Sequence, residues 1–154
     1  MHHRLFSVPL CAFLLTGPVW SEGDSLNALE VAPGLEVSLW AESPLLYNPT
    51  AMDVDEAGRL WVAEAVNYRK WGGRNPGLEF PEGDRVVVLS DEDGDGVAET
   101  STVFAQDEDL VSPLGVLVLG GGRVLVSCSP RALLYTDTDG DLRADRKEVF
   151  LEGF

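Results

Sequence analysis

The chain has 154 residues, of which 26 are Asp or Glu and only 11 are Lys or Arg, so its formal net charge is −15 at pH 7. Nucleic acid is disfavoured as a partner, because phosphate binding needs basic surface. Ten of the acids lie in two short segments, Asp91–Glu99 and Asp137–Glu148. The acidity is therefore concentrated rather than spread as a general solubilising coat.

The N-terminal segment, 1–21, has the layout of a secretory signal peptide. A basic start is followed by an apolar stretch, Leu5–Val19, and then by the small polar residue Ser21. A membrane span is disfavoured, because the stretch is interrupted by Pro and Gly and a spanning helix needs about 20 apolar residues. We expect residues 1–21 to be removed, residues 22–33 to form a linker, and the protein to be exported, either periplasmic or secreted.

The two cysteines predict no disulfide within the exported part. Cys11 lies in the apolar stretch of the signal and would be removed with it, which leaves Cys128 alone. Cys128 ends an alternating apolar run, so we expect a buried or half-buried strand residue without thiol chemistry.

The rest of the chain repeats itself. Pro49–Val62 matches Pro113–Val126 without a gap, and further on Asp91–Phe104 matches Asp137–Phe150. The first pair of matching segments lies farther apart in the chain than the second pair. The difference is an insertion in the first copy, between Ala65 and Arg85.

Each copy contains four short runs of β-type residues separated by turn residues. The predicted strands are 51–55, 59–65, 85–90 and 101–105 in the first copy, and 114–119, 123–127, 132–136 and 147–151 in the second. Four strands in a unit of about 45 residues is typical of a β-propeller blade. The sequence therefore predicts an all-β fold, with blades of an incomplete β-propeller over residues 34–154.

A further alternating run, Gly34–Ala41, precedes the first blade. We expect Leu35–Ala41 to be an N-terminal closing strand of the ring, because such a strand covers an exposed sheet edge. A propeller needs at least four blades. The two predicted here would thus pair with remaining blades of a longer chain or assembly, and alone would expose apolar surface and associate.

The second acidic segment has the oxygen-ligand spacing of a calcium loop. Carboxylates stand at positions 1, 3, 5, 9 and 12 of a twelve-residue loop: Asp137, Asp139, Asp141, Asp145 and Glu148. Leu142 stands at position 6, where Gly normally permits a sharp turn, so this loop is predicted to be the more strained.

The first acidic segment differs in the opposite sense. Gly96 is present at position 6, but position 12 is Thr102, so a bidentate carboxylate is missing there. The predicted ligands are Asp91, Asp93, Asp95 and Glu99. On ligand charge we rank the second loop as the tighter site. The flanking runs favour strands, which disfavours an EF-hand, and the alternative is that both loops are polar hairpin turns without metal.

From Pro33 to Phe154 the chain resembles the propeller domain of membrane-bound dehydrogenases of planctomycetes and verrucomicrobia, distant relatives of quinoprotein sugar dehydrogenases. Short motifs carry the resemblance: Pro33-Gly-Leu-Glu-Val, Asn48-Pro, Gly58-Arg-Leu-Trp-Val-Ala-Glu64, Asn67-Tyr68, and the two DxDGD loops with their Val-Phe ends. It implies a six-bladed ring, oxidation of a sugar or other alcohol with pyrroloquinoline quinone, and in longer relatives a c-type haem domain.

The chain departs from a complete enzyme of that kind. It has no CxxCH motif, and its histidines are His2 and His3 within the signal. We therefore assign no catalytic residue, and leave open whether the protein is a dehydrogenase or a non-catalytic, calcium-stabilised propeller that binds carbohydrate or protein.

The insertion contains the one basic and aromatic cluster of the chain. Tyr68, Trp71 and Phe80 could stack on a sugar, and Arg69, Lys70 and Arg74 are the candidates for holding an anionic cofactor. The alternative is a surface loop whose aromatic residues pack on their own blade. Glu64 is either a buried acid near that face or an exposed carboxylate at a strand end.

Overall fold

The computed structural model describes residues 29–70 and 79–153. The chain divides between Ser38 and Leu39 into two compact units. The predicted signal peptide and residues 71–78 of the insertion, with Trp71 and Arg74, lie outside the described residues.

The second unit is all-β, as predicted, and consists of two four-stranded antiparallel sheets with consecutive strands as neighbours. Blade 1 contains β1 (Pro49–Val54), β2 (Leu60–Glu64), β3 (Arg85–Ser90) and β4 (Thr100–Gln106), and blade 2 contains β5 (Gly115–Gly120), β6 (Arg123–Cys128), β7 (Arg131–Thr136) and β8 (Arg146–Glu152). A 3₁₀ turn, η1 (Asn67–Lys70), follows β2. Among the described residues, no helix has the length and apolar character needed to cross a bilayer.

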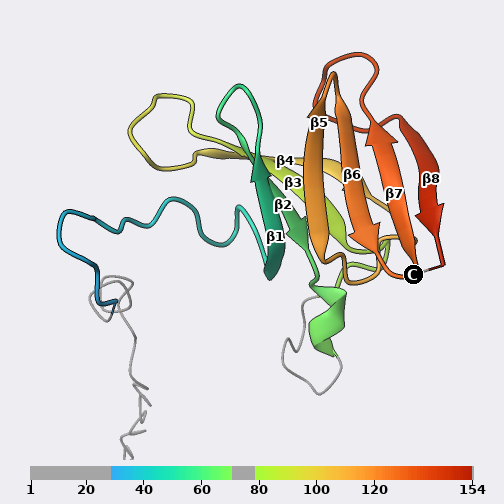
Figure 1. Ribbon diagram of the computed structural model, residues 1–154, viewed down its shortest axis with the longest axis horizontal. Coiled ribbons are helices and arrows are strands. Elements are labelled where there is room, and N and C mark those ends of the chain that lie inside the picture. The colour runs from blue at the N-terminus through green and yellow to red at the C-terminus, as the bar shows by residue number, and fades with distance from the viewer. Residues whose placement is uncertain (1–28, 71–78, 154) are drawn as a thin grey trace, which may run out of the picture. The chain divides into compact units, whose positions relative to one another are not determined.

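The two blades lie face to face (Figure 1), with β1 and β2 against β5. Antiparallel order places the β1–β2 and β3–β4 connections at one end of blade 1 and the β2–β3 connection, with η1, at the other. The acidic loops are the β3–β4 and β7–β8 connections, so both belong to the end opposite η1.

The β1–β2 hairpin illustrates how local sequence sets the strands. Gly58 adopts a positive φ of 81°, which glycine tolerates without steric cost. The Asp55 carboxylate accepts the backbone N–H groups of Ala57 and Arg59 at 2.9 and 3.0 Å, and the Trp61 indole N–H at 2.9 Å. One acidic side chain therefore closes the turn and fixes the first buried aromatic of β2.

The main core lies between the blades. Trp61 and Phe104 of blade 1 pack edge to face with ring centroids 4.7 Å apart, and both are almost fully buried, at 3% and 2% exposure. The core residues from blade 2 are mostly β-branched or aromatic: Val124, Val126, Leu133 and Tyr135. The Val118 N–H of β5 also donates to the Asp53 carboxylate of β1 at 2.8 Å. The blades are thus joined by both apolar burial and a polar contact.

The segment predicted as a closing strand does not form a strand in this structure. Residues Leu35–Ala41 have no strand conformation. An alternating apolar run becomes a strand only when a neighbouring edge supplies ladder hydrogen bonds, and none of the described strands pairs with this segment. Instead, Trp40 and Ala41 pack against a smaller cluster formed by Val62, Val87, Leu89 and Ala98 on blade 1.

Candidate metal loops

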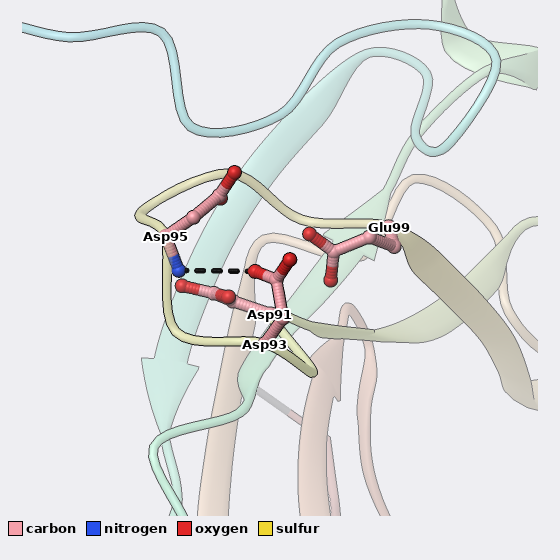
Figure 2. Close-up of side chains that lie close together, drawn as sticks. All are labelled: Asp91, Asp93, Asp95 and Glu99. Atoms are coloured by element: carbon pink, nitrogen blue, oxygen red, sulfur yellow. Dashed lines mark hydrogen bonds between the residues drawn. The ribbon is translucent and has the colours of Figure 1, made fainter.

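The first acidic loop brings all four of its predicted ligands together. One oxygen from each carboxylate lies within 4.8 Å of the others, and the four residues are Asp91, Asp93, Asp95 and Glu99. Figure 2 shows Glu99 and Asp91 directed toward each other across the loop. Because Glu99 directly precedes β4, that strand positions the fourth carboxylate opposite the turn that carries the other three.

Backbone N–H groups order these carboxylates from within the loop. Gly94 and Gly96 donate to the two oxygens of Asp91 at 2.6 and 2.9 Å, and Glu92 donates to Glu99 at 2.7 Å. Each carboxylate has further lone pairs for a cation, since an ionised carboxyl offers about four acceptor sites. Hydrogen bonds within the loop therefore hold the Asp91 and Glu99 carboxylates in place.

The second loop repeats this hydrogen-bond pattern at the equivalent residues of blade 2. Gly140 and Leu142 donate to the two oxygens of Asp137 at 2.6 and 2.9 Å, and the Thr138 N–H donates to Asp145 at 2.8 Å. Burial tends to raise the pKa of Asp137, but the N–H donors of Gly140 and Leu142 outweigh it and hold that pKa below its ordinary value. Asp137 is thus kept ionised.

The second loop gathers fewer carboxylates than predicted. Asp137, Asp139 and Asp145 converge within 4.8 Å, but Asp141 and Glu148 are not part of the group. Glu148 lies within β8, opposite Leu134, and pairs with Arg146 at 2.9 Å. The expected role of Glu148 as a bidentate ligand is not supported, because the pairing of β8 with β7 holds Glu148 within the strand and outside the carboxylate group. The geometry ranks the first loop above the second, the reverse of the ranking by charge.

The predicted strain at Leu142 is confirmed. Its φ of 63° lies in the left-handed region, where the equivalent Gly96 has φ 93°. For a non-glycine residue that conformation costs about 1 to 2 kcal/mol. The Leu142 side chain packs against the core between the blades, together with Ala144. Apolar contact therefore offsets the backbone cost.

The end of blade 1 that carries the β2–β3 connection, called the insertion end below, contains a buried ion pair. Glu64 is fully buried, so the buried alternative is the correct one. It accepts hydrogen bonds from the Arg85 guanidinium and the Tyr47 N–H. Burial raises the pKa of Glu64, and the Arg85 hydrogen bond opposes that rise. The Arg85 guanidinium also lies 4.4 Å from the Phe80 ring centre. Phe80 thus packs on its own blade.

Sequence reasoning missed a second buried acid, Asp84. It is fully buried and accepts the N–H groups of Asn67 and Ser112, each at 2.8 Å. These bonds tie the start of η1 to the connection between the blades. The signal that could have identified it is its place directly before β3, where a polar residue at the end of an apolar strand can bond neighbouring turns.

The remaining residues singled out from the sequence lie in η1 and in β6. Tyr68 is exposed, and Arg69 and Lys70 complete η1. Cys128 is a buried strand residue, as expected. Its sulfur lies 3.0 Å from the Val111 nitrogen and 2.8 Å from the Val111 oxygen, and burial raises its pKa. Burial and the raised pKa both disfavour the reactive thiolate form of Cys128.

Comparison with known proteins gives one family match. A family model described as a domain of unknown function, DUF7133, matches residues 21–154. No curated protein and no solved structure matches the chain.

Proposed function

The chain belongs to the DUF7133 family, a family of domains of unknown function. That family gives no function, so we propose one from the residues of the chain: it forms calcium-stabilised blades of an exported β-propeller. The observation that carries the proposal is the recurrence of one carboxylate arrangement. The β3–β4 and β7–β8 loops hold their first, third and ninth residues in the same hydrogen-bond pattern, and these carboxylates converge in both.

The charge of the loops supports a cation. Two unit charges 4 Å apart repel by about 1 kcal/mol even in bulk water. Four converging carboxylates in the first loop therefore disfavour the folded conformation unless a cation neutralises them. An all-oxygen donor set suits a hard divalent ion, and Ca²⁺ accepts six to eight oxygens in a flexible geometry, whereas Mg²⁺ demands an octahedron. Water and backbone carbonyls would complete the shell.

The test is thermal unfolding of the chain during a calcium titration. Binding to the folded state alone adds RT ln(1 + [Ca²⁺]/Kd), about 2.7 kcal/mol at a hundredfold excess over Kd. We expect millimolar Ca²⁺ to raise the melting midpoint and a chelator to reverse the rise. Melting curves that do not change with Ca²⁺ would refute the metal sites.

Matched variants locate the effect. Glu99→Gln removes a carboxylate of the first group, whereas Glu92→Gln removes an exposed acid of the same loop outside the group. Asp139→Asn and Asp141→Asn form the corresponding pair in the second loop. We expect only Glu99→Gln and Asp139→Asn to weaken the calcium response. Equal effects within a pair would indicate general screening of charge instead of a site.

For the whole protein we propose the dehydrogenase role that the resemblance implies: oxidation of a sugar or alcohol with pyrroloquinoline quinone. The supporting features are the motif similarity and the basic residues Arg69, Lys70 and Arg74. Remaining propeller blades would be the partners, and the N-terminal sequence supports periplasmic or secreted localisation. The test is oxidation of a sugar panel by the full-length protein loaded with the quinone and Ca²⁺.

One observation favours the second candidate, a non-catalytic propeller that binds carbohydrate or protein. The acids buried at the insertion end, Glu64 and Asp84, are both engaged in structural bonds, to Arg85 and Tyr47 and to Asn67 and Ser112 respectively. Neither is placed as a general base. Binding to a glycan array without turnover in the oxidation assay would support this candidate.

A further inference from the structure

The interface between the blades shows how one blade of this repeat receives the next. Phe104 of β4 is the extra residue of a β-bulge, since Val86 pairs with Ala105 and Val87 with Val103. Its ring is buried in the core between the blades, and its carbonyl accepts the N–H of Ala144 at 2.8 Å. Ala144 belongs to the β7–β8 loop of the following blade.

Blade 1 repeats this contact with the residues that precede it. The N–H of Ala98, the repeat equivalent of Ala144, donates to the Trp40 carbonyl at 2.8 Å. Trp40 precedes Pro49 by the same interval as Phe104 precedes Pro113, and it packs on the outer face of blade 1. In both places an aromatic residue packs on the next blade, and its carbonyl receives the N–H of a loop alanine.

Phe150 of β8 is the third residue of this series. It is the repeat equivalent of Phe104 and is also the extra residue of a bulge, since Ala132 pairs with Leu151 and Leu133 with Val149. Its exposure is 62%, against 2% for Phe104. Two neighbouring residues of blade 2 are only half buried, Leu125 of β6 and Leu134 of β7. They pair with each other as their repeat equivalents in blade 1, Trp61 and Val88, pair with each other.

We propose that this face of blade 2, formed by Leu117, Leu125, Leu134 and Phe150, is a docking surface for a further blade of the same repeat. The inference rests on the proposed function in that a further propeller blade is the partner, it adds the surface that receives that blade, and it does not depend on calcium binding. The partner presents a β-branched face like that of β5–β7, and a small residue in its β3–β4-type loop donates its N–H to the Phe150 carbonyl. Continuity with the interface between blades 1 and 2 identifies this partner.

A second copy of the chain is a poorer occupant. The corresponding face of blade 1 already holds Trp40, in the position that Phe150 of another copy would need. Docking of a copy would therefore require Trp40 to leave its contacts with Val62 and Leu89. A blade whose face is not covered in this way has no such cost.

The test extends the chain after Glu152 by a second copy of residues 107–152. This addition keeps the register, because Glu152 is the repeat equivalent of Gln106. We expect the added blade to be protected from amide exchange. Phe150→Ala should lower the melting midpoint of the extended chain by about 6 °C or more, as expected for a buried aromatic, and leave the parent chain nearly unchanged.

The control is Val149→Ala, since Val149 is similarly exposed but is the bulge neighbour of Phe150. It should have the same effect in both chains. An added blade without exchange protection would overturn the proposal, and so would an equal effect of Phe150→Ala in the two chains. Self-association of the parent chain that Phe150→Ala abolishes would assign the surface to a second copy and also overturn it. None of these readouts requires Ca²⁺, so failure here is distinguishable from failure of the metal sites.

Discussion

Gly122 and Asp137 are in direct backbone contact. The Asp137 N–H donates to the Gly122 carbonyl at 2.9 Å, and a Cβ at position 122 would lie 2.2 Å from the Asp137 carbonyl oxygen. The β5–β6 hairpin therefore supports the first residue of the second acidic loop. Only glycine permits the backbones to approach this closely.

Gly122→Ala should displace the second loop. The clash is with a backbone oxygen, which cannot rotate away, and the positive φ of 73° adds strain. We expect a loss of stability of about 2 kcal/mol and a weaker calcium response. The matched control is Gly121→Ala, which has a similar φ of 61° and open space around the Cβ. Thermal unfolding of both variants with and without Ca²⁺ is the measurement, and equal calcium responses would contradict the proposed support.

The positive φ shared by Gly96 and Leu142 predicts a contrast between the two loops. Gly96→Ala should lower the free energy of unfolding by about 1 kcal/mol, because its Cβ meets no atom that could offset the strain. Leu142→Gly relieves strain but removes a side chain that packs on the core, so we also expect it to destabilise. Denaturant unfolding checks both, and a stabilised Leu142→Gly protein would show that the packing does not outweigh the strain.

Trp61 combines packing with a hydrogen bond, and two substitutions separate them. Trp61→Ala should cost about 3 to 5 kcal/mol, because it empties a buried site beside Phe104. Trp61→Phe keeps most of the packing and loses the bond to Asp55, so about 1 kcal/mol is expected. Equilibrium unfolding gives both values. A Trp61→Ala cost below about 1 kcal/mol would contradict the burial of this side chain.

The buried pair of Glu64 and Arg85 should behave as a unit. Arg85→Leu leaves a fully buried carboxylate without its guanidinium, which typically costs about 3 to 5 kcal/mol. Replacing both residues with leucine removes the uncompensated charge, so the double variant should be more stable than Arg85→Leu alone. A double-mutant cycle by denaturant unfolding measures the coupling. Additive losses would indicate that the two side chains do not interact.

The raised pKa of Glu64 predicts a pH dependence. The folded state retains the proton more strongly than the unfolded state, so the contribution of Glu64 to stability is complete below the unfolded pKa of about 4.3 and is lost as pH rises through the folded pKa. The stability of the parent protein relative to Glu64→Gln should therefore fall with rising pH. Unfolding curves between pH 4 and 7 measure this difference, and the opposite slope would show that Arg85 outweighs burial.

Local patterns in the sequence determined the strands and the convergence of carboxylates in the first acidic loop. Alternating apolar residues and glycine turns identified the strands of both blades, because side-chain alternation is a property of each strand by itself. The carboxylates of Asp91, Asp93 and Asp95 converge because they belong to one tight turn, whose conformation depends on its own glycines. These features involve residues close in sequence, so their spacing was sufficient to predict them.

Tertiary structure decided the features that depend on distant partners. Leu35–Ala41 has the alternation of a strand but lacks a paired edge, and Glu148 has the right spacing but belongs to the β7–β8 ladder. Glu64 is buried because Arg85 and Tyr47 satisfy its charge and hydrogen bonds. Pairing, burial and charge compensation are set by residues far away in the chain, and spacing along one segment carries no information about them.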